Sequence, residues 1–112
     1  MRNRKMSKMN RWATASAVAV LMAGVMAFAQ SQGASTYKAH CQMCHGMQGT
    51  PNPGIAKMMG VKPAKDPAVK KLTEAQMIEV TTNGKGKMPA FKSKLSGAQI
   101  KDAVTYFRTF TK

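Results

Sequence analysis

The chain has 112 residues and carries 18 Lys and Arg against four Asp and Glu, a formal net charge of +14. This length allows one domain at most, and a domain this small usually needs a crosslink, a metal or a cofactor to support its core. The charge does not indicate nucleic-acid binding, because residues 30–112 contain a single arginine, Arg108, and no series of aromatic side chains on which bases could stack. We therefore expect an acidic protein surface, and no nucleic acid, as the partner.

The first 29 residues differ from the rest of the chain. They begin with five basic residues and no acidic one, and an uncharged stretch follows from Trp12 to Ala29. The small residues Ala27 and Ala29 flank Phe28, which is the pattern that a signal peptidase cleaves. We therefore expect residues 1–29 to be a signal peptide cleaved after Ala29 and residues 30–112 to be exported to the periplasm. A retained membrane anchor is the alternative, since the length of this uncharged stretch lies at the short end of the range for membrane-spanning helices.

The first helix of the exported part is predicted over residues 34–44, because four apolar or cysteine residues recur at intervals of three and four and so share one helical face. This face consists of Ala34, Tyr37, Cys41 and Cys44. Residues 46–60 are rich in Gly and Pro, which predicts a loop with at most one helical turn, at residues 55–59.

Capping signals mark the next helices. Asp66 followed by Pro67 reads as an N-cap with proline at the first helical position, and predicts a short helix over 67–71. Thr73 and Gln76 form a capping box for a helix that runs to about residue 82.

The same box recurs before the last helix, at Ser96 and Gln99. That helix turns a regular apolar face inward. The face consists of Ile100, Ala103, Val104, Phe107 and Phe110. Because no segment alternates long enough for a strand, the sequence predicts an all-α domain of three to four short helices.

His40, Cys41, Cys44 and His45 lie within six consecutive residues. A structural zinc site would need ligands from two separated segments, and the chain has no other Cys or His. A dithiol redox centre would normally follow a strand, and none is predicted. A disulfide between the two cysteines would close a very short loop and would stabilise little. These three interpretations are therefore disfavoured.

The spacing C-x-x-C-H, from Cys41 to His45, is the attachment motif of c-type haem. Cysteines three residues apart lie on one edge of a helix, where both sulfurs can reach the two vinyl groups of one porphyrin, and His45 can then ligate the iron. One covalently attached haem c would also supply the core that a small domain lacks. His40 is expected to face solvent.

The sixth iron ligand is predicted to be Met88. His and Met form the common axial pair in c-type electron carriers. Met88 stands in the segment NGKGKMPAF, on a loop between two predicted helices, and is followed by Pro89. Met58 or Met59 is the less favoured choice, and an open sixth position is the remaining one.

These residues resemble the class I c-type cytochromes, which are small monohaem electron carriers. The resemblance extends over residues 30–112. It includes Gly33 and Tyr37 before the motif, Cys41, Cys44 and His45 within it, the segment KMPAF with Met88, and Tyr106 in the last helix. The resemblance implies a cytochrome c fold around one haem, with a proline carbonyl that accepts a hydrogen bond from Nδ1 of His45. Pro53 is the candidate, ahead of Pro51 and Pro63.

We therefore expect a monomeric periplasmic electron carrier, not an enzyme, in which the iron cycles between Fe(II) and Fe(III). Two alternatives stay open: a haem-bearing subunit of a larger membrane redox complex, and a haem enzyme with a labile sixth ligand. The lysines around Met88 either form a basic ring that steers acidic-faced redox partners or serve solubility alone. They are Lys85, Lys87, Lys92 and Lys94.

Overall fold

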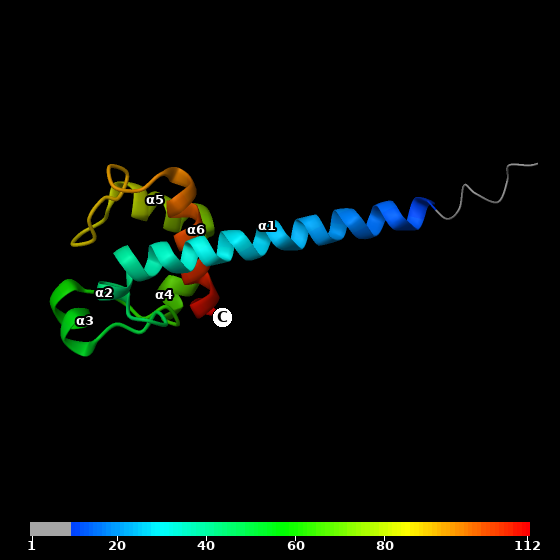
Figure 1. Ribbon diagram of the computed structural model, residues 1–112. Helices are drawn as coiled ribbons and strands as arrows, with labels where there is room; N and C mark the ends of the chain where they lie inside the picture. The colour runs from blue at the N-terminus through cyan, green and yellow to red at the C-terminus, as the bar shows by residue number, and fades with distance from the viewer. Residues whose placement is uncertain (1–9) are drawn as a thin grey trace, which may run out of the picture.

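The computed structural model describes residues 10–112, and these form helices joined by loops, without a strand in that range (Figure 1). The elements are α1 (Asn10–His40), α2 (Gln42–His45), α3 (Pro53–Met59), α4 (Pro67–Lys70), α5 (Glu74–Asn83), α6 (Gly97–Arg108) and the 3-10 turn η1 (Thr109–Thr111). The prediction of an all-α fold is confirmed. Six α-helices replace the expected three to four, because the motif forms a helical turn of its own and the middle loop contains α3.

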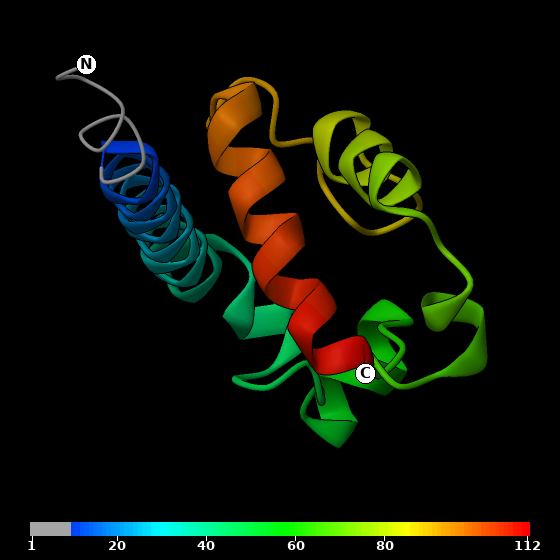
Figure 2. The same ribbon diagram turned by 90° about the vertical axis from the view of Figure 1, so that its right-hand side faces the viewer.

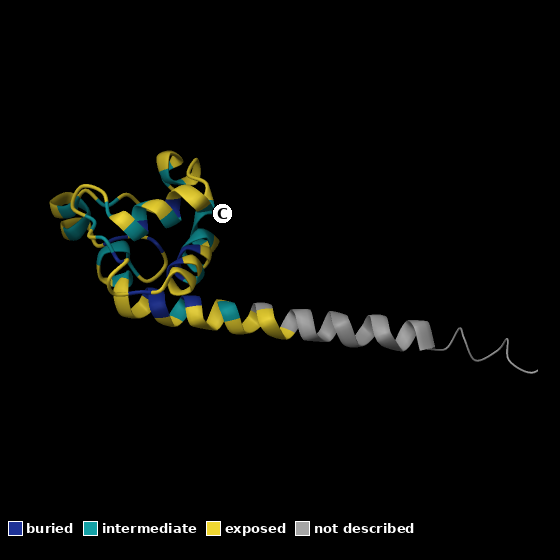
Figure 3. Cartoon of the chain, turned by 90° about the horizontal axis from the view of Figure 1, so that it is seen from above, coloured by how far each residue is buried: buried dark blue, intermediate teal, exposed yellow. Residues whose placement is uncertain are grey.

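Helix α1 is much longer than the predicted helix over 34–44 and runs through Ala29 without a break. It projects away from the rest of the molecule (Figure 1). Of the described side chains between residues 24 and 32, only Ala29 is partly covered, and Gly33 is the first buried residue (Figure 3). The helix therefore begins to pack on the domain at Gly33. Across the described residues, no helix is both long and apolar enough to cross a membrane.

Helix α1 crosses α6 at a point of close backbone approach. A Cβ atom on Gly33 would collide with the Asp102 carbonyl of α6 and lie 3.2 Å from Cβ of Tyr106. Four residues later, Tyr37 is only 2% exposed, and its ring lies 5.4 Å from that of Tyr106 between centroids. A small residue followed by an aromatic one thus lets the two helices meet closely and then fills the space beyond the crossing.

Helix α6 lies between α1 and α5 (Figure 2). On the α5 side it shares a core with the segment that joins α5 to α6. The cluster consists of Met77, Phe91, Leu95, Ile100 and Val104. An ion pair of 3.1 Å between Glu74 and Arg108 joins the first residue of α5 to the last residue of α6.

The predicted caps are confirmed. Thr73 Oγ1 accepts from the Gln76 amide at 3.2 Å, and Gln76 Oε1 accepts from the Thr73 amide at 2.9 Å. Ser96 and Gln99 form the equivalent pair at α6. Helix α3 starts in the same way as α4: Asn52 Oδ1 accepts from the Gly54 amide at 2.9 Å, and proline occupies the first turn. Helix α3 therefore covers seven residues, where the sequence predicted one turn.

Candidate haem-binding site

The C-x-x-C-H motif lies at a corner of the chain. Helix α1 ends at His40, Cys41 forms a turn, and α2 is a single helical turn that ends at His45. The amides of Cys44 and His45 both donate to the Cys41 carbonyl, at 3.2 and 3.0 Å. Because residues three apart in such a turn are neighbours, the two thiols lie on one side of it. Both cysteines are free and half-buried.

The chemistry of Cys41 does not suit a thiol redox centre. Burial, and after it the neighbouring Cys44, raises the pKa of the Cys41 thiol to about 11. A reactive thiol needs a depressed pKa, since the thiolate is the nucleophile. A metal site of side chains alone is not supported either, because the part of the chain that the structure describes has no group of three or more His, Cys, Asp or Glu placed to hold an ion.

The His45 imidazole is partly buried beside the last helix. Its ring lies edge-on to that of Phe107, with 5.5 Å between centroids. Burial lowers the pKa of His45, so the ring is neutral at pH 7, which is the form that ligates metals. Its Nδ1 is buried and has no hydrogen-bond partner. The predicted bond to the Pro53 carbonyl is therefore wrong: Pro53 is exposed and begins α3.

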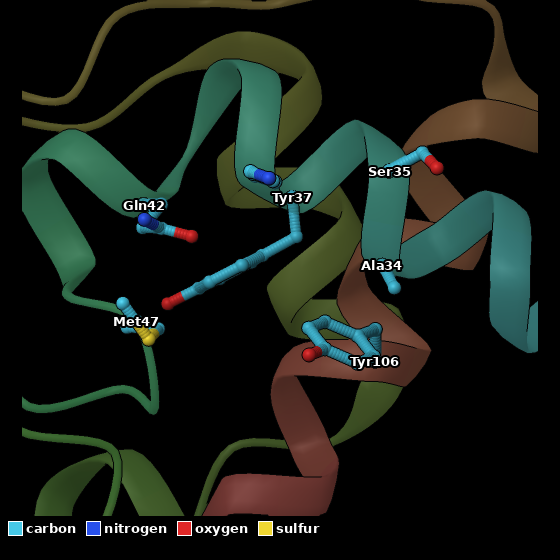
Figure 4. A pocket seen from close by; sticks show the side chains of 7 residues that line it. Ala34, Ser35, Tyr37, Gln42, Met47 and Tyr106 are labelled. Atoms are coloured by element: carbon cyan, nitrogen blue, oxygen red, sulfur yellow. The ribbon is translucent and has the colours of Figure 1, made fainter.

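The segment directly after His45 is anchored by Tyr37. The Tyr37 hydroxyl donates to the Gly46 carbonyl at 2.6 Å, and burial raises the pKa of this hydroxyl. A cavity of about 340 Å³ lies beside it, with Gln42, Met47 and Tyr106 in its wall (Figure 4). Its wall includes none of the four predicted haem-site residues.

Met88 lies on a tight turn after α5, in the segment 84–90, which we call the Met88 loop. Its amide donates to the Lys85 carbonyl at 3.0 Å, and the Lys85 amide donates back to the Met88 carbonyl at 3.1 Å. Gly84 precedes this pair with φ of +77°, and a Cβ atom there would lie 2.8 Å from the Met88 carbonyl oxygen. Glycine at this position therefore lets the chain turn back tightly enough to form the loop.

The core brings the motif and the Met88 loop to the same part of the molecule. Met88 is half-buried and packs against the core cluster, as does Phe107, the residue that touches His45. The end of α1 also contacts the segment after Met88. The ring of the exposed His40 lies edge-on to that of Phe91, which follows Met88 by three residues, with 6.5 Å between centroids. The expectation that His40 faces solvent is confirmed.

Most of the other methionines are placed differently, although Met59 at the end of α3 is half-buried, as Met88 is. Met43 and Met58 are 87% and 59% exposed, whereas Met77 is 7% exposed and belongs to the core. Two half-buried thiols one turn apart, a neutral imidazole beside Phe107, and a half-buried thioether on a separate loop fit a covalently bound haem. Sequence reasoning missed the Tyr37–Gly46 bond, because no local pattern marks a contact between a helix and the turn after it.

The chain matches known c-type cytochromes over most of its length. The family model described as "Cytochrome C oxidase, cbb3-type, subunit III" matches residues 28–107. Cytochrome c6 of Leptolyngbya boryana is 37% identical over 78 residues, which cover 66% of this chain and 84% of that protein. Among solved structures, the KustC0563 c-type cytochrome is 30% identical with a TM-score of 0.64, and the match covers 71% of this chain and 98% of that one.

These matches agree with the helical fold and with the C-x-x-C-H motif at the corner of α1 and α2. They confirm the resemblance to class I c-type cytochromes, and they establish covalently bound haem c as the cofactor. This chain therefore belongs to the c-type cytochromes, within the family described by the cbb3-type oxidase subunit III model.

Proposed function

We propose that this monohaem electron carrier binds its haem through Cys41 and Cys44 and ligates the iron with His45 and Met88. One observation carries the proposal: the neutral His45 ring and the Met88 side chain border one apolar core, His45 through its contact with Phe107. The haem iron would supply one-electron chemistry by cycling between Fe(II) and Fe(III).

The protein residues have positioning roles in this proposal. Helical turn α2 presents the two thiols on one side. Tyr37 fixes the chain directly after His45, and the Lys85–Met88 pair fixes the turn that carries the thioether. With both axial positions filled by the protein, the site leaves no position for a substrate, so we infer an electron-transfer role and not an enzymatic one.

We further propose that the carrier acts in the periplasm as a monomer after cleavage behind Ala29. Three features support this: the matched family segment starts at residue 28, packing on the domain starts at Gly33, and the described side chains before it are almost all exposed. Its partners are redox proteins, and residues 30–112, with 13 Lys and Arg against four Asp and Glu, carry a net charge of +9 that favours partners with an acidic face.

A second candidate function is a haem-bearing subunit of a membrane redox complex. The description of the matching family model, which names an oxidase subunit, favours it. Intact mass of the protein purified from cells distinguishes the two. A free chain that begins at Gln30 supports the carrier, whereas a chain that keeps residues 1–29 and co-purifies with other subunits supports the complex.

The proposed haem attachment is tested by mass spectrometry of the exported protein. We expect the mass of the chain plus one haem, resistant to acid–acetone extraction, and a single one-electron transition in a redox titration. A variant with Cys41→Ala and Cys44→Ala should carry no covalent haem. A wild-type chain without added haem mass contradicts the proposal.

A further inference from the structure

Lys87, the residue before Met88, reaches across to a helix far away in the sequence. Its ammonium donates to the main-chain carbonyl of Met58 at 2.6 Å, over a separation of 29 residues. Met58 belongs to the last turn of α3, whose carbonyls have no donor within the helix and carry the negative end of the helix dipole. A lysine side chain is a suitable partner for such a carbonyl.

The bond joins the Met88 loop to α3, and each of these two segments also has an attachment of its own. On its own side, the Met88 loop is tied to α5, because the Phe91 amide donates to the Thr81 carbonyl at 3.0 Å. On the other side, α3 packs on α2, and no residue of α3 is fully buried. Lys87 therefore connects the loop that carries Met88 to the side of the molecule that carries the cysteines.

We propose that Lys87 is a positioning residue that holds the Met88 loop closed on α3 and so keeps the Met88 thioether at the iron. The second part of this statement rests on the proposed function, since it takes Met88 as the axial ligand. Lys87 acts by limiting local opening of the loop, a motion that exposed segments with few buried contacts undergo readily.

The proposal also separates Lys87 from the neighbouring lysines. Lys85, Lys92 and Lys94 are exposed, as Lys87 is, but Lys87 alone of the four has its ammonium hydrogen-bonded to a main-chain carbonyl, whereas the Lys94 ammonium lies over the Phe91 ring at 5.8 Å from its centroid. A partner that took this ammonium for its own carboxylate would release the loop from α3. Lys87 is therefore assigned to the haem site and not to a docking ring.

The test uses the haem-loaded chain and two readouts. The first is hydrogen exchange of the Met88 amide, which donates to Lys85 and exchanges only when the loop opens. The second is the binding rate of added imidazole, which takes the sixth position when Met88 leaves it. In Lys87→Ala we expect both rates to rise by about 2- to 10-fold, the range that corresponds to one net hydrogen bond. In Lys87→Arg, which keeps a cationic donor, both should return toward wild type.

Lys57→Ala is the matched control, because Lys57 neighbours Met58 on α3, is exposed, and carries the same charge. It should leave both rates unchanged. Equal rate increases in Lys57→Ala and Lys87→Ala would assign the effect to net charge and overturn the proposal, as would unchanged rates in both. If Lys87→Ala speeds exchange of the Met88 amide but Met88→Ala leaves the haem spectrum unchanged, then Lys87 holds the loop closed and Met88 is not the iron ligand.

Discussion

The Tyr37 hydroxyl donates a 2.6 Å hydrogen bond to the carbonyl of Gly46, the residue directly after the predicted iron ligand His45. The buried end of α1 thereby holds the far side of the C-x-x-C-H turn. The same ring packs against Tyr106 and Phe110 of the C-terminal segment, at 5.4 and 5.8 Å between centroids. One side chain thus links the haem-attachment turn to the α1–α6 crossing.

Tyr37→Phe should lower the free energy of unfolding by about 1 kcal/mol, because it leaves the Gly46 carbonyl without its donor and keeps the ring packing. Urea unfolding of the haem-loaded protein measures this. The covalent haem should remain. A variant as stable as wild type at neutral pH would show that solvent replaces the bond at no cost.

The same variant should change the dependence of stability on pH. Burial raises the pKa of Tyr37 above its ordinary value of 10.0, so the unfolded chain loses this proton first as the pH rises. The contribution of Tyr37 to stability is therefore present below about pH 10 and falls at higher pH. The difference in the free energy of unfolding between wild type and Tyr37→Phe should therefore shrink from about pH 9 to about pH 11. Urea unfolding of both proteins at several pH values in this range measures it. A constant difference would contradict this assignment.

Gly33→Ala should destabilise the domain by about 1–3 kcal/mol, the usual cost of overpacking. The added methyl group would meet the Asp102 carbonyl and Cβ of Tyr106, and the backbone of α6 has no flexible end that can yield. Gly97→Ala is the control, since a Cβ atom at that first position of α6 meets nothing within 4 Å. It should be neutral or slightly stabilising. Equal thermal midpoints for the two variants would refute the close crossing.

Local signals were readable from the sequence because each depends on neighbouring residues. The capping boxes at Thr73 and Ser96 form as predicted, since the partner of each stands three residues away. Helix α3 was underestimated, although Asn52 caps it just as Asp66 caps α4. The Gly and Pro residues around α3 indicate a loop, and they outweighed the N-cap signal of Asn52 and Pro53 in the prediction.

Contacts between distant segments were not readable in the same way. The Lys87–Met58 bond spans 29 residues, and its existence depends on the path of the whole middle segment. The prediction that Pro53 accepts from His45 failed for the same reason: Pro53 starts α3, and Nδ1 of His45 stays unpartnered. The roles of Cys41, Cys44, His45 and Met88 at the haem remain predictions.

Met88→Ala should leave the haem attached but abolish the low-spin His/Met spectrum. The reduction potential should fall by more than about 59 mV, because an axial thioether favours reduced iron. A shift of about 59 mV corresponds to a tenfold change in the equilibrium constant of a one-electron couple. Met58→Ala is the control, since Met58 is 59% exposed on α3. An unchanged spectrum in Met88→Ala together with an altered one in Met58→Ala or Met59→Ala would move the ligand to α3.

The last prediction concerns the exposed lysines near Met88 other than Lys87. Replacing Lys85, Lys92 and Lys94 with Gln should slow electron transfer to the physiological partner and flatten its salt dependence, if these side chains steer association. Long-range attraction weakens as the Debye length falls from about 30 Å at 0.01 M to about 10 Å at 0.1 M salt. The haem spectrum should not change, and Lys87 is kept because it binds Met58.

The matched control replaces Lys62, Lys65 and Lys70 with Gln. These lysines are exposed between α3 and α5, and their replacement removes the same charge. Stopped-flow rates of transfer at several salt concentrations compare the two triple variants. Slowing confined to the Lys85 set supports a docking surface beside Met88, because rim charges act mainly on the association rate. Equal slowing in both sets would assign the effect to net charge. Unchanged rates in both would leave the three lysines a role in solubility alone.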